Sequence, residues 1–213
     1  IDITNYLIKQ HQIEALIVAC NTATSAAIKN LRELFPSLIV IGTEPGIKPA
    51  IANSKSQHIG ILATPATLKG EKYQELLKTL DVENKVTLYE QACAGLVEQI
   101  EKGESSSFKT KNMLTKWLKP MKDNDVDTIV LGCTHYPLVS SEIREIMGED
   151  IVLIETGNAI AKRLNSLSQE KGHLNEGLLK VFIYSTNGIH LNVVNQILDE
   201  YSYVGSIDIR RDK

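Results

Sequence analysis

The sequence predicts an α/β fold of two similar lobes, with largely parallel sheets flanked by helices. Short runs rich in β-branched residues alternate with longer helical patterns along the chain. The strand-like runs are almost wholly apolar, as expected when helices cover both faces of a parallel sheet. In addition, a ten-residue segment near the start is echoed in the second half of the chain, which suggests a repeated lobe.

The elements follow from these patterns in chain order. The chain opens on a helical pattern, in which Ile3, Tyr6 and Leu7 fall on one face. Apolar runs predict strands at residues 15–19, 38–41, 58–62, 85–88, 128–131, 151–154 and 181–184. Helical patterns predict helices at residues 24–34, 68–80, 96–100, 109–122, 141–147, 158–168 and 191–198.

Two segments rich in turn residues predict where the chain crosses between lobes. These are "GTEPGIKPA" at residues 42–50 and "ETGNA" at 155–159, each directly after a predicted strand. The first lobe is therefore predicted from residues 1–48 and 156–213, without its N-terminal strand, and the second lobe from 49–155. The segment "EKGESSSFK" at 101–109 is predicted as a polar loop with no evident chemistry.

Composition excludes several classes of protein. The 213 residues carry a net charge of −3 with acidic and basic residues interspersed, so no basic tract indicates a nucleic-acid partner. No apolar run approaches the ~20 residues that cross a bilayer, and no signal-peptide pattern is visible. The helical pattern is already under way at Ile1, so we expect that residues upstream of it are missing from this chain.

The three cysteines are Cys20, Cys93 and Cys133. Their wide spacing without a CxxC pair argues against a zinc cage, and free thiols favour a reducing cytoplasm. Cys93 lies in "EQACAGLVEQI" away from any switch from strand to helix, and is predicted to be a packing residue.

The repeat centres on the other two cysteines. "IEALIVACNT" at 13–22 matches "VDTIVLGCTH" at 126–135, and each cysteine ends a predicted strand and precedes a helix. Ligands of open α/β sheets bind beyond the carboxyl ends of strands. Both thiols are therefore predicted to face one cleft between the lobes, which would be the active site. A single such cysteine is more often a core residue, but two in matching contexts favour chemistry.

The neighbouring residues suit a reactive thiol. A helix N-terminus lowers the pKa of a cysteine and can hold a carboxylate, together with Asn21, Thr22 and Thr134. His135 could exchange protons with Cys133 or with the substrate. Metal binding lacks the ligands, and redox exchange or covalent catalysis leaves one cysteine without a task. Two opposed thiols suit inversion of a stereocentre, in which one removes a proton while the other supplies one.

At these residues the sequence resembles the glutamate racemases of the cofactor-independent aspartate/glutamate racemase superfamily. The signature motifs are "ACNTAT" at 19–24 and "LGCTHYPL" at 131–138. The resemblance extends to "EPGIKPA" at 44–50, "GILATPATLKG" at 60–70 and "GLVEQIEKGE" at 95–104. It implies an isomerase that interconverts L- and D-glutamate without pyridoxal phosphate or metal, and supplies D-glutamate for peptidoglycan. It also implies a cytoplasmic homodimer that requires no nucleic acid and no membrane.

The resemblance also implies residue roles. Cys20 would be the base toward D-glutamate and Cys133 the base toward L-glutamate, with His135 assisting Cys133. Glu98 would support the histidine, although a solvated helix face explains it equally well. The substrate-binding residues would be Asn21, Thr22, Thr64, Thr67 and Thr134. Turn or helix-cap duty is a competing explanation for Thr64 and Thr67.

The sequence departs from the family pattern in two places. The family begins with a strand ending in Asp-Ser-Gly, which this sequence does not contain, and "ETGNA" replaces a similar run later. We expect the first segment to be missing from this chain rather than lost from the protein. Two alternatives stay open: a relative acting on aspartate, a hydantoin or a malonate, which the "CTHYP" run disfavours, and a non-catalytic amino-acid-binding or regulatory protein.

Overall fold

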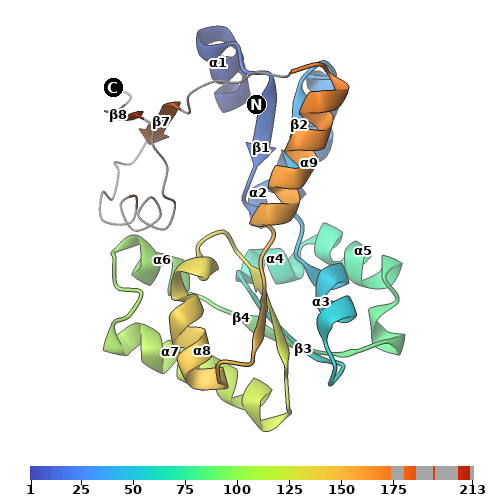
Figure 1. The fold of residues 1–213 in the computed structure, drawn as a ribbon, viewed down its shortest axis with the longest axis vertical. Helices are drawn as coiled ribbons and strands as arrows, with labels where there is room; N and C mark the ends of the chain where they lie inside the picture. The colour runs from blue at the N-terminus through green and yellow to red at the C-terminus, as the bar shows by residue number, and fades with distance from the viewer. Residues whose placement is uncertain (174–179, 186–193, 195–205, 212–213) are drawn as a thin grey trace.

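The computed structural model describes residues 1–173, 180–185, 194 and 206–211. Its strands form three parallel sheets, with the orders β1-β2, β4-β3-β5-β6 and β7-β8. The first two sheets belong to two lobes, one above the other in Figure 1. The predicted α/β fold class is confirmed, since every described strand pairing is parallel and helices flank the two sheets.

The elements have the following bounds. The strands are β1 (Ala15–Val18), β2 (Ile39–Gly42), β3 (His58–Ala63), β4 (Thr87–Ala92), β5 (Thr128–Gly132), β6 (Val152–Ile154), β7 (Lys180–Ser185) and β8 (Ser206–Arg211). The α-helices are α1 (Asp2–His11), α2 (Asn21–Leu34), α3 (Ile47–Asn53), α4 (Pro65–Lys69), α5 (Glu71–Thr79), α6 (Leu96–Glu101), α7 (Phe108–Asp123), α8 (Ser140–Met147) and α9 (Gly157–Glu170). Two 3₁₀ turns are η1 (Val82–Asn84) and η2 (Tyr136–Val139).

The four-stranded sheet of the lower lobe is buried on both faces. Side chains alternate along a strand, so Ile129 and Leu131 of β5 pack against α6, α7 and α8. Val130 points the other way, into a core formed with α3 and α5. This burial on both faces explains why the central strands are wholly apolar in sequence.

The upper lobe places α2 and α9 beside β2 (Figure 1). Ile28 and Leu31 of α2 form its core with Val40 of β2. The chain leaves this lobe after β2 and returns to it after β6, at the start of α9. The proposed domain boundaries near residues 48 and 156 stay a prediction. No helix among the described residues is long and apolar enough to cross a membrane.

Several elements differ from the sequence prediction. The helix expected at 68–80 is two helices, because Gly70 between them has extended backbone and Thr64 caps the first with Pro65 at its start. The strand expected at 85–88 is β4, which begins at Thr87. Among the described strands, β4 is at the sheet edge and pairs only with β3, so it tolerates polar residues, which obscured its pattern in the sequence.

Three other elements complete the comparison. Helix α3 was missed, because its segment contains Pro49 and was interpreted as a loop. Strand β8 was also missed. The helix predicted at 191–198 lies outside the described residues, apart from residue 194.

Candidate active site

A cavity of about 250 Å³ lies between the lobes. It forms where several strands end, because parallel strands bring their carboxyl ends to one edge of each sheet. Its wall includes residues that follow β1, β2, β5 and β6, namely Ala19, Asn21, Thr43, Cys133, Thr134, Glu155 and Thr156. Of the predicted site residues, Asn21, Cys133 and Thr134 line this cavity, whereas Cys20 is not on its wall.

Cys20 lies at the junction of β1 and α2. It is the N-cap residue of α2, with extended backbone, and its carbonyl oxygen accepts a hydrogen bond of 2.8 Å from the Thr24 amide. The helix starts here because the residues that follow bury Thr24, Ile28 and Leu31 against the upper sheet. Cys20 lies at the helix entrance, where the sequence placed it, and it is exposed.

Asn21 connects the two cysteine motifs directly. Its side chain is only 8% exposed, and Nδ2 donates a hydrogen bond of 2.8 Å to the carbonyl oxygen of Gly132. Each partner of this bond is the immediate neighbour of a candidate catalytic cysteine. The backbone segments that carry Cys20 and Cys133 are therefore held side by side.

Cys133 is half-buried just beyond the end of β5. Burial raises the pKa of its thiol, and a charge on Cys20 raises that pKa further. Hydrogen bonds from the His135 amide and from Thr134 act in the opposite direction. The sequence predicted a lowered pKa from a helix N-terminus, which is wrong for Cys133. The segment after this cysteine leads into η2 rather than directly into an α-helix, so burial prevails.

His135 lies between Cys133 and a carboxylate. Its Nδ1 is 3.8 Å from the Cys133 sulfur, and its Nε2 is 3.1 Å from Oε1 of Glu101. Sequence reasoning selected Glu98 for this support and missed Glu101. The two residues lie three apart on α6, so they are neighbours on the helix surface and the sequence pattern does not separate them. A role for Glu98 stays a prediction.

Three predicted threonines form one hydroxyl cluster at the N-termini of α2 and α4. The Thr22 hydroxyl lies 3.3 Å from the hydroxyls of both Thr64 and Thr67, which are 2.9 Å from each other. Thr64 also caps α4 by accepting a hydrogen bond from the Thr67 amide. The competing helix-cap explanation is thus correct for Thr64, and it does not conflict with binding, because a hydroxyl can both accept and donate.

Two other residues clarify the site. Cys93 is 2% exposed within the core of the lower lobe, where burial raises its pKa to about 12, so the predicted packing role is confirmed. Thr43 follows β2 and lines the cavity, and its buried hydroxyl has no hydrogen-bond partner among the described residues. It was missed because a threonine within a turn-rich segment gives no signal of its own.

The arrangement suits proton transfer between two thiols and one small polar ligand. Cys20 lies close enough to Cys133 for its charge to affect the pKa of that thiol. Hydroxyl and amide groups surround both cysteines, and they match the carboxylates and ammonium of an amino acid. Among the residues that the structure describes, His135 and Glu101 lie on the Cys133 side, so the two thiols have different surroundings.

Comparisons with known proteins point in the same direction. Residues 3–164 match the model of the Asp/Glu/hydantoin racemase family. The glutamate racemase of Aliarcobacter butzleri (strain RM4018) is 66% identical over 198 residues, which cover 93% of this chain and 76% of that protein. The glutamate racemase of Sulfurovum sp. (strain NBC37-1) is 58% identical over 210 residues, or 99% of this chain and 79% of that protein.

A solved structure shows the same fold. The glutamate racemase of Escherichia coli, in complex with L-glutamate and the activator UDP-MurNAc-ala, superimposes with a TM-score of 0.77 at 26% identity. The match covers 98% of this chain and 78% of that chain.

Proposed function

This chain belongs to the Asp/Glu/hydantoin racemase family, and from this premise we propose that it is a glutamate racemase that works through two thiols. It interconverts L- and D-glutamate and supplies D-glutamate for peptidoglycan synthesis. The observation that carries the mechanism is the pairing of Cys20 and Cys133, whose adjacent residues are joined by the bond from Asn21 to Gly132. In a two-base racemisation, an acid and a base act on opposite faces of one carbon.

The two cysteines together carry one proton before and after each turnover. The thiolate of one cysteine removes the α-proton of glutamate and becomes a thiol. The thiol of the other cysteine then protonates the opposite face of the carbanion and becomes a thiolate. Cys20 is the base toward D-glutamate and Cys133 the base toward L-glutamate, so the two exchange roles in the reverse direction.

The Cys133 side has its own proton relay. His135 contacts the Cys133 sulfur through Nδ1 and the Glu101 carboxylate through Nε2. The carboxylate fixes the orientation of the imidazole, which then assists proton exchange at Cys133. Glu101 takes the supporting role here because its carboxylate, 3.1 Å from Nε2, makes the contact.

The polar groups around the cavity bind the substrate. The hydroxyls of Thr22, Thr64 and Thr67 form one group, and Asn21 and Thr134 lie on the cavity wall. We assign these groups to the carboxylates and ammonium of glutamate. A cytoplasmic homodimer without a cofactor belongs to the same proposal, carried over from the sequence.

Replacement of each cysteine tests the assignment. The full chain is incubated with L-glutamate in heavy water, while circular dichroism follows racemisation and mass spectrometry follows α-deuteration. We expect Cys20→Ser and Cys133→Ser each to lower kcat by at least about a hundredfold, because a serine hydroxyl is a much weaker acid and base than a thiol.

Cys93→Ala is the matched control, because this thiol is buried in the core and does not line the cavity. It should racemise glutamate at close to the normal rate. If the normal protein neither racemises nor deuterates glutamate, the proposed function is wrong. If one serine variant retains full activity, the two-thiol mechanism is wrong.

A further inference from the structure

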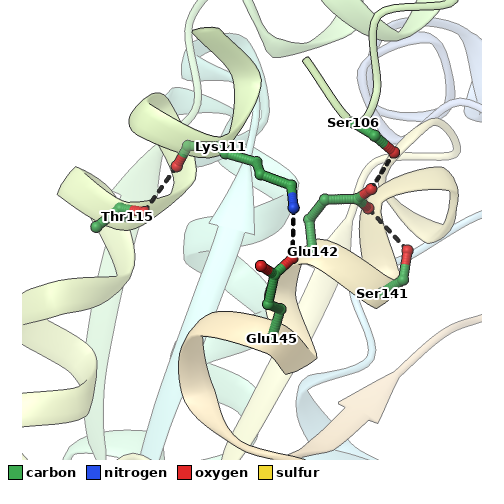
Figure 2. Close-up of polar contacts among 6 residues, drawn as sticks. All are labelled: Ser106, Lys111, Thr115, Ser141, Glu142 and Glu145. Carbon is green, nitrogen blue, oxygen red and sulfur yellow. Dashed lines mark hydrogen bonds and ion pairs between the residues drawn. The ribbon is translucent and has the colours of Figure 1, made fainter. Parts of the chain in front are cut away.

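A buried carboxylate joins the loop after α6 to the start of α8 (Figure 2). Glu142, in the first turn of α8, is only 5% exposed and accepts hydrogen bonds from the hydroxyls of Ser106 and Ser141. Ser106 belongs to the polar loop between α6 and α7, which the sequence indicated to be without chemistry. The contact from Ser106 to Glu142 therefore fastens this loop to the start of α8.

Each residue of the Ser106–Glu142 contact comes shortly after Glu101 or His135 along the chain. Glu101 is the last residue of α6, and the loop containing Ser106 begins directly after it. His135 precedes η2, and η2 runs without a break into α8, where Glu142 lies. The segments that carry His135 and Glu101 are thus joined twice. The first contact is between His135 and Glu101 themselves, and the second is between Ser106 and Glu142.

The contact between His135 and Glu101 contributes little free energy of its own. The side chains of His135 and Glu101 are 31% and 51% exposed, and exposed ion pairs contribute little net free energy. The loop after Glu101 also turns through Gly103 at φ 74°, a left-handed conformation that glycine adopts without strain. The contact between Ser106 and Glu142 gives this loop a second, buried attachment.

We propose that Glu142 is a positioning residue of the racemase, which acts through Ser106 to hold Glu101 against His135. The proposal rests on the proposed function, because it assigns His135 and Glu101 to the Cys133 relay. A buried carboxylate with two hydroxyl donors suits this task, since removal of either donor leaves a polar group unsatisfied away from water.

The neighbouring ion pair provides a matched control. Lys111 of α7 and Glu145 of α8 approach to 2.6 Å between Nζ and Oε2, one helical turn from Glu142 (Figure 2). This pair joins α7 to α8, but both of its side chains are exposed and neither belongs to the loop after Glu101. Glu145→Ala should therefore leave racemisation unchanged.

The test compares Ser106→Ala, Glu142→Ala and Glu145→Ala in the full chain. We expect the first two to lower kcat for glutamate by about tenfold with little change in KM, because misplacing a supporting group affects chemistry more than binding. Ser106→Thr keeps the hydroxyl and should restore most of the rate. Ser106→Ala carries the test even if Glu142→Ala does not fold.

A second measurement does not depend on turnover. Alkylation of the thiols by iodoacetamide is followed by mass spectrometry over a range of pH, with Cys20 and Cys133 read separately. In Ser106→Ala we expect the Cys133 profile to move to higher pH, because a displaced imidazole no longer stabilises the thiolate. The Cys20 profile should stay in place.

The outcomes separate the two proposals. An unchanged kcat and an unchanged Cys133 profile in Ser106→Ala would overturn the positioning role, as would equal shifts at Cys20 and Cys133, which indicate general loosening. A Ser106→Thr variant as slow as Ser106→Ala would also count against it. If the normal protein does not act on glutamate, the proposed function fails, and the alkylation profiles still decide whether Glu142 positions the site.

Discussion

Cys133 shows how one residue can suit a reaction by holding its proton rather than losing it. Its burial raises the pKa of the thiol, and the nearby Cys20 opposes a second negative charge. A two-thiol racemase needs one thiol and one thiolate at the same time, and two fully ionised cysteines could not supply a proton. The raised pKa therefore favours the singly protonated pair that the proposed two-thiol mechanism requires.

This property predicts the alkaline limb of the pH profile. A group with a raised pKa keeps its proton to higher pH, so the singly protonated pair should persist above about pH 8.5, the ordinary pKa of cysteine. We expect kcat/KM for glutamate to fall only above that point. Initial rates by circular dichroism, measured across pH in both directions, check this. A decline of kcat/KM that is complete by roughly pH 8 would contradict it.

Asn21, Cys133 and Thr134 were predicted from the sequence and line the cavity. They could be predicted because topology brings the carboxyl ends of parallel strands together. Glu101, Ser106 and Glu142 were not predictable, because their contacts join segments that are remote in sequence. Periodicity reports which face of a helix is buried, but not which side chain across a loop will meet it.

At the scale of the elements, Gly132 determines how closely β5 and β3 approach. A Cβ atom on this residue would lie 2.9 Å from the Leu62 carbonyl oxygen and 3.0 Å from the Cβ of Ala63. The first of these is a backbone atom of β3, which cannot move aside alone. The glycine thus allows the close strand pairing directly before the Cys133 motif.

We expect Gly132→Ala to destabilise the protein by about 1–3 kcal/mol, because overpacking forces backbone shifts in a buried sheet. Urea unfolding measures the change in free energy. Gly157→Ala is the control, since a Cβ there meets nothing within 4 Å. Equal unfolding midpoints for the two variants would show that the sheet absorbs the extra methyl group.

The elements themselves were predictable to the extent that each is buried. Strands β3 and β5 were found at nearly their true positions because both faces are covered, which makes the whole run apolar. Strand β4 was displaced and the 68–80 helix was not divided. An edge strand need not be apolar throughout, and a break at Gly70 depends on local capping rather than on periodicity.

At the scale of the whole molecule, Asp127 holds two segments of the lower lobe together, at the end of its sheet opposite the cavity. Its carboxylate accepts bonds of 2.7 Å from the Ser54 hydroxyl and from the amides of Lys55 and Ser56. These contacts fasten the turn between α3 and β3 to the residue before β5. Burial raises the pKa of Asp127, but its hydrogen bonds outweigh burial and lower that pKa to about 2.

This predicts a specific loss of stability in acid. A carboxyl group with a lowered pKa stabilises the fold above its unfolded pKa, and that contribution disappears as pH falls through the folded value. We expect the melting temperature to fall between about pH 4 and pH 2 partly through Asp127. Asp127→Asn should melt lower than the normal protein at neutral pH, with the difference shrinking toward pH 2. Scanning calorimetry measures both, and a constant difference would rule this out.

The hydrogen bond from Asn21 to Gly132 also affects how the lobes can move. It lies one residue from each candidate catalytic cysteine and spans the boundary between the upper and lower lobes. A rotation of one lobe about a point this near to both sulfurs changes their separation least, while the distant rim of the cavity moves most. The bond would therefore act as a pivot for any rotation of one lobe against the other, and such a rotation would leave the spacing of the two thiols nearly constant.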